Sequence, residues 1–332
     1  MKAAAEGKPL LGPNQKRTSG RTRAMSSPHT KHPTSRQIEA HGIRLHIHEW
    51  MGPDPTLVCL HPLGFTGRVF ASMAEALFGS HRILCPDLRG HGRSDKPPEG
   101  YQYPNLCRDL AGMLQMLHLH RIILLGHTWG ADIAMAFAAA HPKRLEGLIV
   151  IDGGYRFRRT LSPEEERLSP DRIRSSPEFS SMEEALHDAR EQLDVSWTDH
   201  VEAAVRDSLE ISPQGTARYR LSDPQWQRIF SALFDYDPAA LFKKVRVPTL
   251  IVHPTGQRNE HNDQARFQAR SAALLMDDAT YLPIEASDNI NLLTSPVFHE
   301  YITCFIEGRL NGRHAIPPPD MRASSPCPSP AP

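Results

Sequence analysis

The stretch Gly126-His127-Thr128-Trp129-Gly130 constrains the fold of this chain more than any other. It follows an apolar run at 122–125, which predicts a buried parallel strand, and precedes an apolar run at 131–140, which predicts a helix. The two glycines allow a strand and a helix to pack closely around a sharp turn, whose central residue is lifted above the sheet edge. Thr128 occupies that centre, and a β-branched residue is unusual where the backbone is strained.

Similar apolar runs alternate with helical patterns along the rest of the chain. Strands are predicted near 56–60, 82–86, 122–126, 147–152, 248–253 and 279–283, and helices near 68–78, 104–117, 129–141 and 297–308. This alternation predicts an α/β fold with a mostly parallel, doubly wound sheet that is covered by helices on both faces.

The segment from His41 to Trp50 alternates polar and apolar residues, which predicts a half-buried edge strand. His46 and His48 lie on one face of this strand, so a pair of metal ligands is conceivable. No third ligand has a suggestive spacing, and solvated histidines are therefore the preferred interpretation.

About ninety residues between Gly154 and Pro248 lack clear sheet character. Three stretches within them, at 182–190, 201–209 and 225–234, have helical periodicity. We predict a helical insertion at 155–247, which divides the core into 37–154 and 248–310. The insertion is either a lid over the active site or a packing layer without a gating role. Its aromatic residues line an apolar substrate pocket or belong to the core, the candidates for the pocket being Trp197, Trp226 and Phe230.

The charge balance and the apolar pattern exclude several classes of partner. Lys and Arg total 38 and Asp and Glu total 38, so no charge excess favours nucleic acid or a membrane surface. No apolar run reaches the length of about 18 residues that a membrane span needs. Five cysteines, two of them on or beside predicted core strands, indicate a reduced cytoplasmic protein. Neither a dinucleotide-binding glycine pattern nor a cluster of metal ligands occurs, so we expect no cofactor and no metal. The oligomeric state is left open.

Both ends of the chain are predicted to lie outside the folded core. Residues 1–36 contain eight Lys or Arg and one Glu among many small and polar residues, which predicts a disordered basic extension rather than a nucleic-acid-binding arm. This segment lacks the apolar core of a secretory signal, and Met25 is an alternative start of the chain. Residues 311–332 are rich in proline and predict a solvated, irregular tail.

Five segments, in this order, resemble the α/β-hydrolase superfamily. The stretch His61-Pro62-Leu63-Gly64 is similar to its oxyanion loop, and the stretch at 85–94 is similar to its D-x-R-G-x-G-x-S turn. The turn at 126–130 resembles its G-x-S-x-G nucleophile elbow, with threonine in place of serine. The runs at 148–154 and 248–253 resemble the strand after the nucleophile helix and the strand before the acid. The resemblance covers roughly residues 37–310 and implies an α/β-hydrolase fold with an inserted helical lid.

The resemblance implies a hydroxyl nucleophile, a histidine base, an acid that orients the histidine, and two backbone donors for an oxyanion. Leu63 and Trp129 stand at the two donor positions. Asp288 occupies the slot of the histidine, and no histidine lies between His261 and His299. A carboxylate with an ordinary pKa near 4 is a poor base for an alcohol.

The acid position also departs from the family pattern. Gln257 stands where the family has aspartate, and Glu260 or Asp263 would replace it if the loop bends. A second location for the acid, after the strand that follows the nucleophile helix, holds Asp152. The alternative role of Asp152 is to cap or brace its loop.

Two histidines are further candidates for the site. His253 ends a strand at the active-site edge and is considered as a base or a pocket residue, although nothing in its spacing favours this over a structural role. His61 is considered as a pocket residue, and the usual role at its position is to brace the loop.

The sequence therefore predicts an enzyme that acts on a small organic molecule, an apolar carbonyl or ester compound. Hydrolysis is the default reaction, and an altered triad of Thr128, Asp152 and Asp288 carries it. Two alternatives remain open. One is a lyase, isomerase or cyclase of secondary metabolism, in which burial raises the pKa of the carboxylates so that they transfer protons. The other is an inactive protein that keeps the ligand cavity.

Overall fold

The computed structural model describes residues 32–157, 178–193, 195–256 and 260–308, and for 260–262 it describes the backbone alone. All of these residues belong to one compact unit, Lys31–Pro332. Most of the predicted basic extension and the whole proline-rich tail lie outside the described residues.

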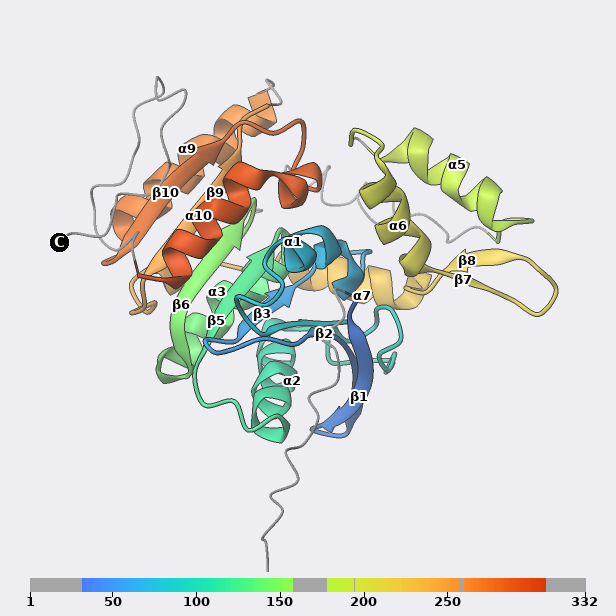
Figure 1. Cartoon of the computed structure of the whole chain (residues 1–332), viewed down its shortest axis with the longest axis horizontal. Helices are drawn as coiled ribbons and strands as arrows, with labels where there is room; N and C mark the ends of the chain where they lie inside the picture. The colour runs from blue at the N-terminus through green and yellow to red at the C-terminus, as the bar shows by residue number, and fades with distance from the viewer. Residues whose placement is uncertain (1–31, 158–177, 194, 257–259, 309–332) are drawn as a thin grey trace, which may run out of the picture. The chain divides into compact units, whose positions relative to one another are not determined.

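An eight-stranded sheet forms the centre of this unit, with the order β1-β2-β4-β3-β5-β6-β9-β10 (Figure 1). Strand β2 pairs antiparallel with β1 and with β4, and every other pair is parallel. This confirms the predicted, mostly parallel sheet. The strands are β1 Thr34–Ala40, β2 Ile43–Trp50, β3 Leu57–Leu60, β4 Ile83–Pro86, β5 Ile122–His127, β6 Leu145–Ile151, β9 Thr249–Pro254 and β10 Ala279–Ile284.

The sequence interpretation was wrong about the edge at which the chain enters the sheet. The expected edge strand, β2, lies second in the sheet, and β1 forms the edge instead. Strand β2 lies between β1 and β4, and His46 and His48 are buried and not solvated. Strand β1 begins at Thr34, so the last three residues of the predicted extension belong to the sheet.

Helices cover the sheet on both faces, as two separate clusters of buried side chains show. One face carries α2 Tyr103–Met116, α3 Trp129–Ala140 and α9 Glu260–Leu275, and the other carries α1 Ala71–Ala76 and α10 Pro296–Ile306. Three short 3-10 helices complete the core, η1 Gly67–Phe70, η2 Pro142–Arg144 and η4 Asn291–Thr294. The pattern analysis missed α9 because its buried positions include alanines, which give little apolar periodicity; these are Ala265, Ala269 and Ala272.

The segment 155–247 holds the three predicted helices. They are α5 Met182–Gln192, α6 Asp199–Ser208 and α7 Asp223–Leu233, followed by the short α8 Ala239–Phe242. It also holds a two-stranded antiparallel sheet that the sequence analysis did not predict, β7 Leu209–Ile211 and β8 Ala217–Tyr219. Each of these strands has three residues, too few for an alternating pattern to be recognised.

Most described cysteines fit the expectation of buried thiols. Cys59, Cys85 and Cys107 are free and buried. Cys304 is disulfide-bonded, so the expectation of a fully reduced chain does not hold for this residue. Among the helices that the structure describes, none combines the length and the apolar character needed to cross a bilayer.

Candidate active site

Thr128 lies on a strained turn between β5 and α3. Its backbone angles are φ 47° and ψ −109°, outside the regions that non-glycine residues normally occupy. Such a conformation costs about 1–3 kcal/mol and persists only where the surroundings enforce it. Here the Thr128 N–H donates to Ile151 O at 2.8 Å, and the Thr128 carbonyl accepts from the N–H groups of Ala131 and Asp132. The turn between β5 and α3 therefore has the strained backbone that the expected elbow requires.

The two glycines that flank the turn are required by close backbone approach. A Cβ atom at Gly126 would lie 2.3 Å from the carbonyl oxygen of Gly130. A Cβ at Gly130 would lie 2.1 Å from the carbonyl oxygen of Leu60, on the neighbouring strand β3. These contacts are far inside van der Waals distance, so any side chain here would push α3 away from the sheet.

The two expected oxyanion donors lie on elements that other residues hold in place. Trp129 is the first residue of α3, so its N–H has no acceptor within the helix. Leu63 lies in a turn that the Phe65 N–H closes by donating to Pro62 O at 3.2 Å. The adjacent Gly64 N–H donates to Nε2 of His91 at 3.2 Å.

His61 braces this loop from below. Its Nδ1 donates to Pro62 O at 2.8 Å, and its Nε2 accepts from the N–H of Leu88 at 2.9 Å. Burial lowers the pKa of His61 to about 4, so the imidazole is neutral at pH 7. Both nitrogens are committed to backbone partners, and His61 is not among the residues that line the cavity described below.

Asp152 lies directly after β6, and its side chain contacts Asn289 in the loop after β10. Its carboxylate, 6% exposed, forms an ion pair with Arg156 and accepts a hydrogen bond from Nδ2 of Asn289 at 2.6 Å. Burial opposes ionisation, but the charge of Arg156 and the Asn289 amide outweigh it and hold the pKa of Asp152 below its ordinary value. Asp152 is therefore an ionised acid whose neighbours are fixed.

Asp288 has a different set of partners. Its Oδ1 accepts from the backbone N–H groups of Ile290 and Asn291, at 3.1 and 2.8 Å, and so caps the start of η4. Its Oδ2 accepts from the N–H of Ser196 at 3.0 Å, which ties the loop to the insertion, and from the side chains of Ser287 and Asn291. Despite burial, these hydrogen bonds lower the pKa of Asp288.

The expectation that burial raises the pKa of these two carboxylates is wrong in direction. Both are held ionised, and they have separate hydrogen-bond partners rather than a shared proton. The residue that contacts Asp152 from this loop is Asn289, one position after the expected slot. The sequence gives no signal for Asn289, because an amide cannot act as a base and so does not stand out as a catalytic candidate.

No described histidine forms a hydrogen bond with Thr128. Nδ1 of His253 lies 3.1 Å from the Tyr155 hydroxyl and 3.9 Å from Oδ1 of Asp152, and its side chain is fully buried. His127 is likewise enclosed, at the end of β5. Burial lowers the pKa of both imidazoles to about 4. Of the alternative acids, Gln257 lies outside the described residues, and so does the side chain of Glu260. Asp263 pairs with Arg266 on the surface of α9.

A cavity of about 420 Å³ lies between the expected oxyanion loop and the helical insertion. This volume is within the range of small-molecule sites. Its walls are mainly apolar, and they are formed by Leu63, Gly64, Phe65, Gln192, Leu193, Val205, Ser208, Tyr219, Leu221 and Trp226.

Of the five expected pocket residues, Trp226 is the one that lines this cavity. The guanidinium carbon of Arg190 lies over the ring of Trp197, 5.0 Å from the ring centroid. The indole N–H of Trp197 donates to Glu202. Phe230 packs edge-on against Phe234, with 5.2 Å between the ring centroids. His61 and His253 are fully buried, and their ring nitrogens contact the backbone of Pro62 and Leu88 and the hydroxyl of Tyr155, respectively.

Acidification from pH 7 to pH 5 should lower the free energy of unfolding. His61, His127 and His253 each have a pKa of about 4 in the folded protein, against an ordinary value of 6.5. Between these values the unfolded chain binds protons that the folded chain does not. Stability is therefore complete above pH 6.5 and declines as the pH falls toward 4, by about 1 to 2 kcal/mol per histidine at pH 5. Urea unfolding at both pH values measures this, and an equal or higher midpoint at pH 5 would contradict it.

Parts of this sequence are similar to a known protein family and to curated hydrolases. A sequence profile described as "alpha/beta hydrolase fold" matches residues 55–252. "Epoxide hydrolase 3" of Siraitia grosvenorii is 35% identical over 117 residues, which cover 34% of this chain and 36% of that protein. "2-(Acetamidomethylene)succinate hydrolase" of Mesorhizobium japonicum is 31% identical over 121 residues, which cover 36% of this chain and 43% of that protein. The chain thus matches less than half the length of these relatives.

Solved structures share the fold over a larger part of the chain. The crystal structure of E-2-(acetamidomethylene)succinate hydrolase superimposes with a TM-score of 0.69 and 23% identity, covering 83% of this chain and all of that one. An α/β hydrolase from Novosphingobium aromaticivorans gives a TM-score of 0.67 and 22% identity, covering 83% of this chain and 98% of that one. At this level of identity the likeness concerns the fold alone.

Proposed function

This chain belongs to the alpha/beta hydrolase fold family, and we propose that it binds a small, mainly apolar carbonyl or ester compound without using Thr128 as an activated nucleophile. The carbonyl oxygen of the ligand points toward the N–H groups of Leu63 and Trp129. The insertion at 155–247 acts as the lid that covers the ligand. Hydrolysis, in this proposal, is limited to what the two backbone donors and the binding contacts provide.

One contact carries this proposal, the 2.6 Å hydrogen bond from Nδ2 of Asn289 to Asp152. In a Ser-His-Asp triad the acid holds the imidazole that removes the proton of the hydroxyl. Here the acid holds an amide, which has no basic nitrogen at neutral pH. The hydroxyl of Thr128 therefore keeps its proton, and the contribution of a general base, about 10²- to 10⁴-fold in rate, is lost.

The ligand-binding half of the proposal is supported by the position of the cavity. Leu63, an expected oxyanion donor, is itself part of its wall, so a ligand in the cavity reaches the donor loop. Most of the residues that line the cavity are apolar, and few of them, such as Gln192, Ser208 and Tyr219, bear a polar group, which favours an apolar ligand with one carbonyl group. The names of the relatives, hydrolases of epoxides and of an acetamidomethylene succinate, support a ligand with a hydrolysable polar bond.

The alternative of carboxylate acid–base chemistry loses its support. A lyase or isomerase of that kind needs a carboxyl group that holds a proton near neutral pH. Asp152 and Asp288 both have lowered pKa values. The carboxylate of Asp288 accepts hydrogen bonds from backbone and side-chain donors around η4. We therefore assign Asp288 to positioning of the loop that presents Asn289.

Calorimetric titration with acetophenone, a small apolar ketone, tests the binding half. We expect saturable binding to the wild-type protein and a loss of affinity of about tenfold or more, which is 1.4 kcal/mol or more, in Leu193→Trp. The larger side chain fills the cavity from a position on its wall. Leu274→Trp, at a residue of α9 that is 87% exposed, is the matched control and should bind as wild type does. Equal affinity in Leu193→Trp, or no binding to the wild-type protein, would refute the assignment of this cavity.

A further inference from the structure

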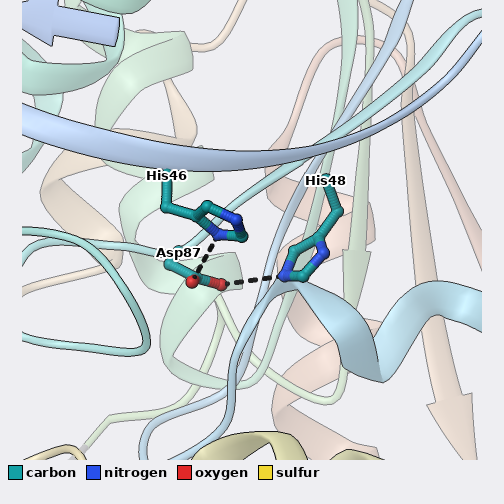
Figure 2. Close-up of side chains that lie close together, drawn as sticks. All are labelled: His46, His48 and Asp87. Atoms are coloured by element: carbon teal, nitrogen blue, oxygen red, sulfur yellow. Dashed lines mark hydrogen bonds and ion pairs between the residues drawn. The ribbon is translucent and has the colours of Figure 1, made fainter. Parts of the chain in front are cut away.

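Two histidines of strand β2 and an aspartate that follows strand β4 meet in a buried cluster where these two strands pair. Nδ1 of His46 lies 2.8 Å from Oδ2 of Asp87, and Nε2 of His48 lies 3.4 Å from Oδ1 of the same carboxylate (Figure 2). The three residues are at most 4% exposed. None of them takes part in the active site proposed above.

The pairing of β2 with β4 explains why sequence spacing did not reveal the third member. His46 and His48 stand two residues apart on β2 and so share a face of the strand. Asp87 follows β4, and its N–H donates to His46 O at 2.8 Å, which continues the antiparallel ladder. The carboxylate comes from a neighbouring strand in space, about forty positions later in the chain.

Asp87 is fully buried, and among the described residues its carboxylate forms ion pairs with His46 and His48 alone. In the part of the chain that the structure describes, neither lysine nor arginine forms an ion pair with it. The backbone N–H groups of Gly67 and Arg93 donate to its two oxygens, at 2.9 and 3.0 Å. The carboxylate thus accepts two backbone hydrogen bonds and lies against both imidazoles.

Asp207 of helix α6 brings a second carboxylate to the cluster. Its Oδ2 lies 3.8 Å from Nε2 of His48 and accepts a hydrogen bond from the Thr66 hydroxyl at 2.7 Å. Its Oδ1 pairs with Arg93 at 3.1 Å. Nε2 of His48 is buried between the two carboxylates and forms no hydrogen bond of normal geometry with any described residue.

We propose that His46, His48 and Asp87, with Asp207 as a fourth ligand, bind a divalent transition-metal ion of the Zn²⁺ type. Two imidazoles with one or two carboxylates form a donor set that suits such ions. The ligand atoms of the first three residues already lie within 4.8 Å of one another. Tetrahedral zinc with bonds of about 2.0 to 2.1 Å needs its ligand atoms about 3.3 Å apart, so separations within this group close by up to about 1.5 Å. Asp207 lies outside the 4.8 Å group; its Oδ2 is 3.8 Å from Nε2 of His48 and has to move toward the other two ligands when the ion binds.

The consequence of this site is mechanical. His46 and His48 belong to the central sheet and Asp207 to the insertion, so a bound ion joins the two by coordinate bonds. The ion would replace the weak interaction of Nε2 of His48 with two carboxylates by direct ligation, and it would leave the hydrogen bonds of Asp87 with the backbone in place. We therefore expect metal binding to stabilise the fold without a role in turnover.

Metal analysis of the purified full-length protein tests the proposal, with Zn²⁺ alone as the probe. After dialysis against Zn²⁺ and removal of free metal, the wild-type protein should hold about one ion per chain, and its Tm should rise with Zn²⁺ and fall with EDTA. His48→Gln should weaken zinc binding by about tenfold or more. His120→Gln, at an exposed histidine outside the cluster, is the matched control and should keep the ion.

A second variant guards against a folding defect in the first. Asp207→Asn removes the charge of a residue whose side chain is 16% exposed, and it keeps an oxygen that can accept from Thr66. We expect this variant to fold and to bind zinc more weakly than the wild-type protein. Zinc retained equally by wild type, His48→Gln and Asp207→Asn would overturn the proposal, and so would a folded wild-type protein that holds no zinc and whose Tm does not respond to it.

Discussion

Replacing Thr128 with serine and Asn289 with histidine in one variant should raise kcat/KM for a short-chain aryl ester by about 10²- to 10⁴-fold over wild type. The imidazole at position 289 would take the place of the amide that now contacts Asp152 at 2.6 Å. Asp152 is already ionised and would orient the new base. Serine fits the backbone at position 128 with less strain than a β-branched residue. Initial rates over a range of ester concentrations measure the effect.

The paired variant Thr128→Ser with Asp288→His is the control. It puts the histidine in the slot that the family resemblance implies, and it removes the carboxylate that accepts from the backbone of Ile290, Asn291 and Ser196. We expect no gain of activity and a less stable protein, because several buried donors lose their acceptor. A gain in this variant, with none in the Asn289→His variant, would reverse our assignment of the two positions.

Gly130→Ala should lower the free energy of unfolding by about 3 kcal/mol or more. The added Cβ would lie 2.1 Å from the carbonyl oxygen of Leu60, which is backbone of β3 and cannot turn aside. Strand β3 lies inside the sheet between β4 and β5, so it cannot shift without breaking its ladders. Urea denaturation of the two proteins, followed by circular dichroism, gives the difference.

Gly215→Ala separates this steric cost from the cost of backbone conformation. Gly215 has φ 91°, and a Cβ there would meet no atom within 4 Å. We expect a loss of about 1 kcal/mol, which comes from the unfavourable backbone angle alone. If Gly130→Ala costs no more than Gly215→Ala, the close packing of α3 on the sheet is not what this position requires.

The sheet could be predicted because its inner strands are continuous apolar runs. Strands β3, β4, β5, β6 and β9 lie inside the sheet, and each is buried at every position or at all but one. The elements that escaped prediction have weak patterns. Strand β1 is mostly exposed, and β7 and β8 are three residues long. Their structure depends on pairing with neighbours and not on a local apolar signal.

The candidate site was predictable where its geometry depends on local sequence. The glycines around Thr128 predict the sharp turn, and the strained angles at that residue agree with it. The contact between Asn289 and Asp152 joins two loops 137 positions apart. A difference of one residue in the placement of the second loop decided whether an aspartate or an asparagine was assigned to it. The cavity depends on how the insertion packs on the loop 63–65, which no local pattern specifies.

The histidines of β2 illustrate the same limit from another direction. Alternation along the strand placed His46 and His48 on one face correctly, but it could not tell which neighbour covers that face. Asp87 and Asp207 come from β4's end and from α6, so the environment of the two imidazoles is set by tertiary structure.

The initial rate of hydrolysis of a short-chain aryl-ester panel, compared between wild type and Thr128→Ala, tests the central claim most directly. Because Asn289 stands where a base is needed, the Thr128 hydroxyl is not activated, and the two proteins should hydrolyse each ester at rates within about twofold of one another. Any rate above the spontaneous one would then come from the backbone donors and from binding. A fall of about 10²-fold or more in Thr128→Ala would contradict the claim, since it would mean that a base for this hydroxyl exists in the protein.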